Sequence, residues 1–279
     1  MIGPLALREA TDAGVFGGKA AQLAGAATAG LPVPPGVALP WILAEAVAAG
    51  DPDAASGLAA AAAPLGCSLA VRSSAVGEDS VAASFAGQHL SVLGVPPAGL
   101  AAAVQAGARS VVAEPALAYR RALGVAGTPR AGVVVQRMVD ADVAGVLFCP
   151  HPVTGADEIV IEAAWGLGEA VVAGLVTPDL FRLSVAGELL EQRAGVKDIA
   201  VVAVAGGGTA ATPTTSERAR KLCLSESWLA QLHRLAMMCR RAFGGSQDLE
   251  WALAGERLWL LQRRAVTVRT RAGDAEVSR

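Results

Sequence analysis

The stretch that decides the fold is Gln247–Arg264, which reads QDLEWALAGERLWLLQRR. Two apolar runs flank a turn-rich break at Ala254–Arg257, and this pattern predicts a β-hairpin. Residues that face each other across a hairpin share one side of the sheet. The length of the loop therefore decides which side chains of this stretch lie together.

A three-residue loop, Gly255–Arg257, would pair Ala254 with Leu258. One face would then hold three pairs, Glu250 with Gln262, Asp248 with Arg264 and Ala252 with Leu260. The other face would hold Trp251 opposite Leu261 and Leu253 opposite Trp259. One face is apolar and the other gathers an acid, an amide and an arginine, whereas a register shifted by one residue would scatter that polar set. We predict the register with the three-residue loop.

The polar face has the chemistry of a nucleotide–metal site. A carboxylate and a carbonyl oxygen that meet at one point suit Mg²⁺, and a nearby arginine suits phosphate. Glu250, Gln262 and Arg264 would supply these groups.

The composition sets the class of protein. The chain has 279 residues, enough for one large domain or two lobes, and 53% of them are hydrophobic, although many of these are alanine. No run approaches the roughly 20 apolar residues that span a membrane. Glu9 precedes any long apolar stretch, so no signal peptide is expected. We predict a soluble, cytoplasmic protein without a membrane partner.

Charge and metal-ligand residues exclude other classes. A net charge of −2 argues against a nucleic-acid surface. The four cysteines lie far apart with no CxxC, and the three histidines show no ligand spacing such as HxxxH. We expect the cysteines to be small buried residues in a reducing compartment.

The N-terminal half carries two candidate phosphate contacts. Gly17-Gly18-Lys19 opens a helix-forming segment that ends at Gly30, and a helix start beside a lysine is an anion site. The motif alone occurs often, and by itself it favours a solvent-exposed lysine. Leu69–Val71 predicts a short strand that leads into Arg72-Ser73-Ser74, a loop suited to phosphate oxygens.

The middle of the chain predicts a helix over Leu100–Leu123 and then a series of strands. Gln136 interrupts the buried strand Ala131–Val139, and it is either satisfied in the core or faces a ligand. Glu169 follows two spaced glycines at a tight turn into a helix, where an acid is favourable. Further strands are expected at Val143–Phe148, Glu158–Ala163, Leu180–Val185 and Ile199–Val204.

Two segments complete the chain before the hairpin. Gly206–Ser216 is rich in glycine and threonine and predicts a flexible loop. Ser225 can cap a helix that ends at Gly244-Gly245. The apolar stripe of that helix follows spacings of three and four at Leu229, Leu232, Ala236, Cys239 and Phe243.

Eight motifs in order resemble the ATP-binding domain of pyruvate phosphate dikinase, phosphoenolpyruvate synthase and rifampin phosphotransferase. The resemblance runs from Gly17 to Thr267. The motifs are GGKAAQL, GLPVPPG, AVRSSAVGEDSVAASFAGQ, VVVQRMV, AGVLFCPHPVTG, WGLGEAVVAGLVTPD, QDLEWAL and LLQRR.

The resemblance implies an α+β ATP-grasp fold whose two lobes sandwich ATP. We expect lobes at residues 1–130 and 131–270 and a flexible tail at 271–279. Lys19 and Arg72 would contact the phosphates, and Arg264 would steady the phosphoryl group, which makes these three the expected catalytic residues. Gly87 and Ser91 would belong to the loop over the triphosphate, Gln136 would border the nucleotide, and Glu250 and Gln262 would hold Mg²⁺.

The chain departs from the family pattern at three places. Cys149 stands where the family has threonine or serine. The usual ending LQARPET reads Leu261–Thr267 here as LQRRAVT, without its proline. The interval between Lys19 and Arg72 is short for the family. None of these departures removes an expected ligand residue.

The resemblance also implies a partner. Family enzymes move the β-phosphate of ATP to a histidine on a swivelling domain, with release of AMP and phosphate, and then to an acceptor. None of His89, His151 and His233 lies in the threonine-serine-histidine context of that carrier. We therefore expect an ATP-binding component that works with a separate phosphohistidine protein. The alternatives are a stand-alone ATP-dependent phosphotransferase for a small molecule and a non-catalytic nucleotide-binding module.

Overall fold

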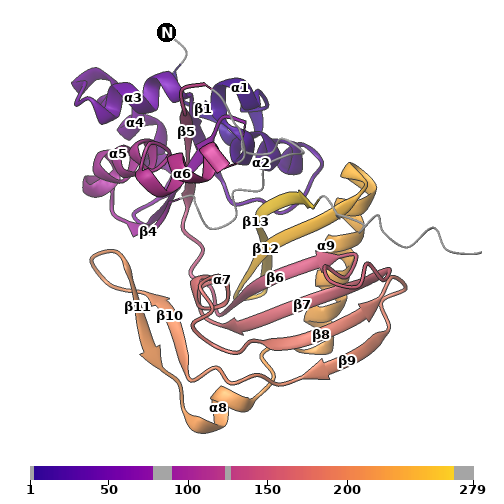
Figure 1. Cartoon of the computed structure of the whole chain (residues 1–279). Helices are drawn as coiled ribbons and strands as arrows, with labels where there is room; N and C mark the ends of the chain where they lie inside the picture. The colour runs from indigo at the N-terminus through magenta and orange to yellow at the C-terminus, as the bar shows by residue number, and fades with distance from the viewer. Residues whose placement is uncertain (1–2, 78–89, 123–126, 267–279) are drawn as a thin grey trace, which may run out of the picture.

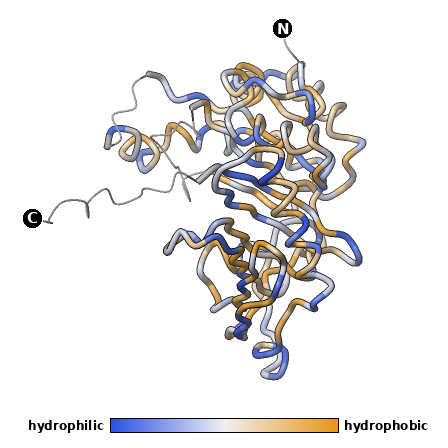
Figure 2. Tube along the Cα trace, turned by 90° about the vertical axis from the view of Figure 1, so that its right-hand side faces the viewer, coloured by the Kyte–Doolittle hydropathy of each residue, from blue (hydrophilic) through white to orange (hydrophobic). Residues whose placement is uncertain are grey.

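The computed structural model describes residues 3–77, 90–122 and 127–266. They form two lobes, each built on an antiparallel sheet (Figure 1). Viewed from the side, one lobe lies above the other, and hydrophobic residues recur along the elements of both (Figure 2). No helix in these ranges is long and apolar enough to cross a membrane. The cytoplasmic location stays a prediction.

The N-terminal lobe contains a five-stranded sheet with helices on both faces. Its strand order is β1 (Leu5–Ala6), β2 (Gly36–Leu39), β5 (Ala131–Arg137), β3 (Leu69–Ala75) and β4 (Ser91–Val95). The helices are α1 (Ala13–Phe16), α2 (Gly18–Thr28), α3 (Trp41–Ala48), α4 (Pro52–Ala62), α5 (Leu100–Ser110) and α6 (Glu114–Ala122), with short 3₁₀ turns at Leu7–Glu9, Ala63–Leu65 and Pro97–Gly99.

The pleat of β5 explains why both faces of this sheet are covered. Val133 and Val135 pack with α3, α4 and α5, whereas Val134 packs with Phe16 of α1 and Leu23 of α2. Successive side chains of a strand point to opposite faces, so an unbroken valine run requires an apolar layer on each side. Helix α2 therefore packs on one face of the sheet, and α3, α4 and α5 pack on the other.

The C-terminal lobe contains a six-stranded sheet and one long helix. Its strand order is β13 (Arg257–Val266), β12 (Ser246–Ala254), β6 (Val143–Cys149), β7 (Glu158–Trp165), β8 (Asp179–Ser184) and β9 (Leu189–Arg193). Helix α9 (Glu226–Phe243) packs on this sheet with Leu229, Leu232, Ala236 and Cys239 buried, as the sequence predicted. The remaining elements are α7 (Glu169–Val172), α8 (Ser216–Arg220) and the pair β10 (Ile199–Ala203) and β11 (Thr209–Pro213).

The tip of the β10–β11 hairpin joins the two lobes. Gly208 donates its backbone N–H to the carbonyl of Gly94 on β4 at 2.8 Å. A Cβ on Gly94 would lie 2.5 Å from the carbonyl oxygen of Gly208, so only glycine permits this approach. Figure 1 shows the hairpin reaching from the C-terminal lobe up to β4.

Several expected elements differ from the structure. Arg72-Ser73-Ser74 continues strand β3 instead of forming a loop, and the expected helix over 100–123 is two helices, because Pro115 lacks an N–H for a continuous helix. The expected loop over 206–216 contains β11, which pairs with β10. Ser225 occupies the cap position of α9, but its hydroxyl contacts Ser227 and makes no capping bond.

Sheet membership places the change of lobe later than residue 130. Strand β5 pairs with β2 and β3 of the first sheet, and the second sheet begins at β6. We propose a lobe boundary between Arg137 and Val143 instead of after residue 130. The tail at 271–279 lies outside the described residues.

The hairpin β12–β13 confirms half of the predicted register. Glu250 lies opposite Gln262 and Asp248 opposite Arg264, as predicted. The other half was wrong: the turn has two residues, Ala254 pairs with Arg257, and the remaining pairs are Leu253 with Leu258, Ala252 with Trp259 and Trp251 with Leu260. The register shifts between Glu250 and Trp251, which leaves Leu261 as the extra residue of a β-bulge.

Candidate functional site

A cavity of about 460 Å³ lies between the lobes. One part of its wall is polar and the other is apolar. The polar part contains Lys19, Arg72, Glu250, Gln262 and Arg264, and the apolar part includes Leu93, Met138, Val139, Leu167, Val172 and Ala252. The structure thus brings together seven of the eight residues singled out from the sequence, because Ser91 and Gln136 also line the cavity. Ser91 does so as the first residue of strand β4, not from the expected loop. The eighth, Gly87, lies outside the described residues.

Lys19 is held at the start of α2 by a close approach to β3. Gly17 has φ +83°, and a Cβ at this position would lie 1.9 Å from the carbonyl oxygen of Ser74. The Ser74 hydroxyl accepts a hydrogen bond from the backbone N–H of Ala20 at 3.0 Å. The Lys19 side chain reaches across to the other lobe, where its Nζ donates to Oε1 of Gln262. Lys19 is buried, so the alternative of a solvent-exposed lysine was wrong.

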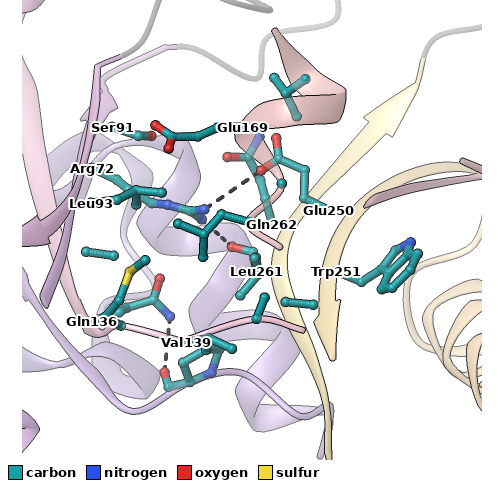
Figure 3. A pocket seen from close by; sticks show the side chains of 18 of the residues that line it. Arg72, Ser91, Leu93, Gln136, Val139, Glu169, Glu250, Trp251, Leu261 and Gln262 are labelled. Carbon is teal, nitrogen blue, oxygen red and sulfur yellow. Dashed lines mark hydrogen bonds and ion pairs between the residues drawn. The ribbon is translucent and has the colours of Figure 1, made fainter. Parts of the chain in front are cut away.

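Arg72 also crosses between the lobes. It lies on strand β3, between β5 and β4, and is 8% exposed. Its Nη1 donates to the carbonyl oxygen of Leu261 at 2.6 Å, and its Nη2 lies 3.8 Å from Oε2 of Glu250 (Figure 3). The bulge explains the first contact, since the ladder is interrupted at Leu261 and its carbonyl can accept from a side chain. Burial lowers the pKa of the Arg72 guanidinium, while Glu250 opposes this shift and Arg264 adds to it.

Glu250 lies between two arginines. The Nη2 of Arg264 is 4.0 Å from Oε1 of Glu250, on the other side from Arg72. Asp248 is two residues earlier on the same face of β12, and burial raises the pKa of its carboxyl to about 6, against the effect of Arg264 and together with that of Glu250. At this end of the cavity the Glu250 carboxylate lies with two guanidinium groups and one ammonium, whereas Asp248 is not among the lining residues.

Gln136 has a hydrogen-bond partner within the protein and also borders the cavity. Its side chain is 3% exposed, and its Nε2 donates to the carbonyl oxygen of Pro34 at 3.1 Å. It also lines the cavity near Met138 and Val139. The amide is thus anchored by the proline-rich connection while it borders the cavity.

Sequence reasoning missed Glu169 as a site residue. Glu169 lines the cavity at the start of α7, and Figure 3 shows its carboxylate directed toward the side where Ser91 lies. Its Oε2 is buried and has no hydrogen-bond partner in the described part of the chain. A buried acceptor without a partner is costly, so a donor from a ligand would satisfy it. The only signal in the sequence was an acid after Gly166-Leu167-Gly168, which also fits a helix start.

The departure at Cys149 does not alter this cavity. Cys149 is 1% exposed, packs in the core of the C-terminal lobe and is not among the residues that line the cavity. Burial raises the pKa of its thiol. Cys149, Cys223 and Cys239 are buried, as predicted for the cysteines, whereas Cys67 is exposed and the prediction was wrong for that residue.

The donor set fits Mg²⁺. Glu250 and Gln262 offer a carboxylate and an amide oxygen from paired positions, and magnesium is usually bound by one or two carboxylates together with substrate phosphates. In the described ranges no group of three or more histidine, cysteine or acidic side chains could hold a metal by itself.

The fold and the cavity define an ATP-grasp protein, in which two α+β lobes enclose a site for ATP. The chain belongs to the family described as "Pyruvate phosphate dikinase, AMP/ATP-binding domain", whose model matches residues 53–279. The resemblance noted from the sequence motifs is thereby confirmed.

Three similar proteins illustrate the comparison. The prodigiosin synthesizing transferase PigC of Serratia marcescens is 38% identical over 285 residues, covering 92% of this chain and 32% of that protein. A rifampicin phosphotransferase of Streptomyces sviceus is 37% identical over 203 residues, 71% of this chain and 23% of that protein. An acetyl-coenzyme A synthetase structure from Ca. Korarchaeum cryptofilum has a TM-score of 0.41 and 12% identity, covering 95% of this chain and 93% of that one. The chain spans less than a third of the length of the two curated relatives.

Proposed function

We propose that this chain is the ATP-binding component of a dikinase-type phosphotransferase. It would bind Mg·ATP between its lobes and pass the β-phosphate to a phosphohistidine domain on a separate protein, with AMP and phosphate released. One observation carries the proposal: Lys19 and Arg72 of one lobe converge with Glu250, Gln262 and Arg264 of the other lobe on one cavity.

The cations would bind and orient the triphosphate. Lys19 offers a compact ammonium and Arg72 a planar fork of donors, and both are held by contacts to the hairpin. Arg264 is more exposed, with a side chain 25% accessible, so it can follow the phosphoryl group as charge moves during transfer. Phosphoryl transfer needs such positioning and charge stabilisation more than covalent chemistry by the protein.

Glu250 and Gln262 would hold the magnesium ion. When bound, the metal would neutralise negative charge on the phosphate oxygens. Both ligands already lie beside the phosphate-binding cations, because Lys19 donates to Gln262 and Arg72 lies near Glu250. The phosphates would therefore meet the metal and the cations at the same place.

The apolar part of the cavity would accept the adenosine. Met138, Val139 and Leu167 give an apolar surface against which a purine could pack. Glu169 Oε2, which has no partner in the described residues, would accept from a hydroxyl or amino group of the nucleoside. The phosphates of ATP would then lie against the polar part of the wall and the adenosine against the apolar part.

The described histidines support an acceptor from elsewhere. His151 Nδ1 accepts from the backbone N–H groups of Val153 and Thr154, and His233 contacts the carbonyl oxygen of Val185. Neither lines the cavity, and His89 lies outside the described residues. The printed names of relatives include rifampicin phosphotransferase and probable phosphoenolpyruvate synthase, which supports phosphate transfer as the class of reaction.

Calorimetry with Mg·ATP and the Glu250→Gln variant tests the binding step. We expect the variant to bind Mg·ATP at least about tenfold more weakly, since it loses the charged metal ligand. Glu188→Gln is the matched control, because Glu188 is an exposed acid outside the cavity. Equal affinity of Glu250→Gln and the unaltered chain would refute the proposed role of Glu250.

The transfer step is tested by mixing the chain with a purified phosphohistidine domain of this family and measuring AMP. We expect AMP from ATP only when both proteins are present. AMP or a phosphorylated small molecule from the chain alone would instead favour a stand-alone phosphotransferase. Binding of Mg·ATP without turnover in either mixture would favour the non-catalytic module.

A further inference from the structure

Arg263 lies between two residues of the proposed site but does not face it. Gln262 and Arg264 line the cavity, whereas Arg263 is absent from its wall and points to the opposite side of β13, as the alternation of a strand requires. It is nevertheless only 8% exposed. In the LQARPET ending typical of the family, this position is alanine, so the buried arginine is a feature that the family pattern does not explain.

The Arg263 guanidinium joins three elements. Its Nη1 donates to Oε1 of Gln247 on β12 at 3.0 Å, and its Nη2 donates to Oε1 of Gln22 on α2. Its Cζ lies 3.9 Å from the ring centroid of Phe243 at the end of α9. Gln247 is itself held, because its Nε2 donates to the carbonyl oxygen of Gly244.

The contact with Gln22 bears directly on Lys19. The two residues are three positions apart on α2, so they lie on neighbouring points of one helical face. Lys19 contacts Gln262, and Gln22 contacts Arg263, the next residue of β13. Two consecutive residues of β13 therefore contact the same turn of α2. Gln262 does so on the face of the strand that lines the cavity, and Arg263 on the opposite face.

We propose that Arg263 is a positioning residue that fixes α2 against β13 and so aims the Lys19 ammonium at the phosphates of ATP. The inference rests on the proposed function, since it assigns Lys19 to ATP phosphates. A planar guanidinium suits this role better than an ammonium, because it makes two hydrogen bonds in fixed directions while its face stacks on an aromatic ring.

The test compares binding of Mg·ATP with binding of adenosine, the phosphate-free probe, by calorimetry on the whole chain. We expect Arg263→Ala to weaken Mg·ATP binding about tenfold and to leave adenosine binding within about twofold. Gln22→Ala should show the same pattern with a smaller loss. The matched control is Arg241→Ala, which removes an exposed arginine from α9 and should change neither affinity.

A double-mutant cycle separates positioning from general support of the fold. If Arg263 acts through Lys19, then Arg263→Ala should have no further effect on Mg·ATP affinity in a Lys19→Met background. Additive losses would overturn the inference, and so would an equal loss of Mg·ATP and adenosine binding. Unchanged Mg·ATP binding by Arg263→Ala would overturn it as well.

Two outcomes keep the inference distinct from the proposed function. An unaltered chain that does not bind Mg·ATP would refute the proposed function and this inference with it, whereas a chain that binds Mg·ATP independently of Arg263 would refute the inference alone. If Arg263→Ala does not fold, Gln22→Ala and Arg263→Lys carry the test. Arg263→Lys is expected to recover only part of the Mg·ATP affinity, and full recovery would show that the fork geometry is not needed.

Discussion

The ion pair between Asp179 and Lys197 lies in the interior of the C-terminal lobe. Both side chains are fully buried. Asp179 Oδ1 accepts from Lys197 Nζ and from the backbone N–H of Gly195 at 2.8 Å, and its Oδ2 accepts from the N–H of Cys223 at 2.7 Å. The Asp179 carboxylate at the start of β8 therefore bonds both the segment that precedes β10 and the segment that precedes α9.

Asp179→Asn keeps the shape of the side chain and removes its charge. A buried ion pair that loses one partner typically costs about 3–5 kcal/mol, because the other charge stays buried without compensation. For a chain of this size, 1 kcal/mol corresponds to roughly 2–4 °C, so we expect Tm to fall by roughly 6–20 °C. The assay is thermal and urea unfolding followed by circular dichroism.

Two comparisons sharpen this prediction. Asp157→Asn breaks an exposed pair in which Asp157 Oδ1 lies 2.6 Å from Nη1 of Arg240, and such pairs contribute at most about 1 kcal/mol. Adding Lys197→Met to Asp179→Asn should recover much of the loss, since no buried charge then remains. A loss below about 1 kcal/mol for Asp179→Asn, or a double variant no more stable than the single one, would refute the reasoning.

Three further predictions concern the site and the thiols. Glu169→Gln should weaken Mg·ATP binding about tenfold, and calorimetry would show unchanged affinity if this is wrong. The free energy of unfolding, measured in urea, should change by less than about 0.5 kcal/mol, because Glu169 Oε2 has no partner to lose in the described structure. Gly17→Ala should destabilise the fold by more than Gly30→Ala. Both glycines have positive φ, but only at Gly17 would an added Cβ clash, with Ser74. Equal losses in the free energy of unfolding in urea would contradict this. At pH 8, iodoacetamide should label only Cys67 in the native protein, because Cys67 is exposed while burial raises the pKa values of the other thiols, that of Cys239 to about 12. Mass spectrometry would count the labels, and all four cysteines should react after unfolding.

Much of the fold could be predicted from short-range patterns. The runs at Ala131–Val139 and Glu158–Ala163 are strands, and the apolar stripe after Ser225 is a helix packed on the second sheet. These patterns are reliable because burial on a strand or helix face imposes a period on the sequence. Breaks such as the one before Pro115 and strands such as β9 and β11 were missed, because their residues are exposed or polar and show no such period.

The hairpin separates what the sequence determined from what only the tertiary structure decided. The alternation along Gln247–Arg264 determined that Glu250 faces Gln262 and that Asp248 faces Arg264. The tertiary structure decided that the turn has two residues and that a bulge at Leu261 restores the register beyond it.

The physical reason is that the compensation involves residues far away in the chain. The carbonyl of Leu261 receives Arg72, and Trp251 and Leu260 enter the core under α9. A local pattern cannot encode a shift that is stabilised by another lobe. The burial of Lys19 against Gln262 likewise depends on contact between the two lobes, because the two residues are far apart in the chain.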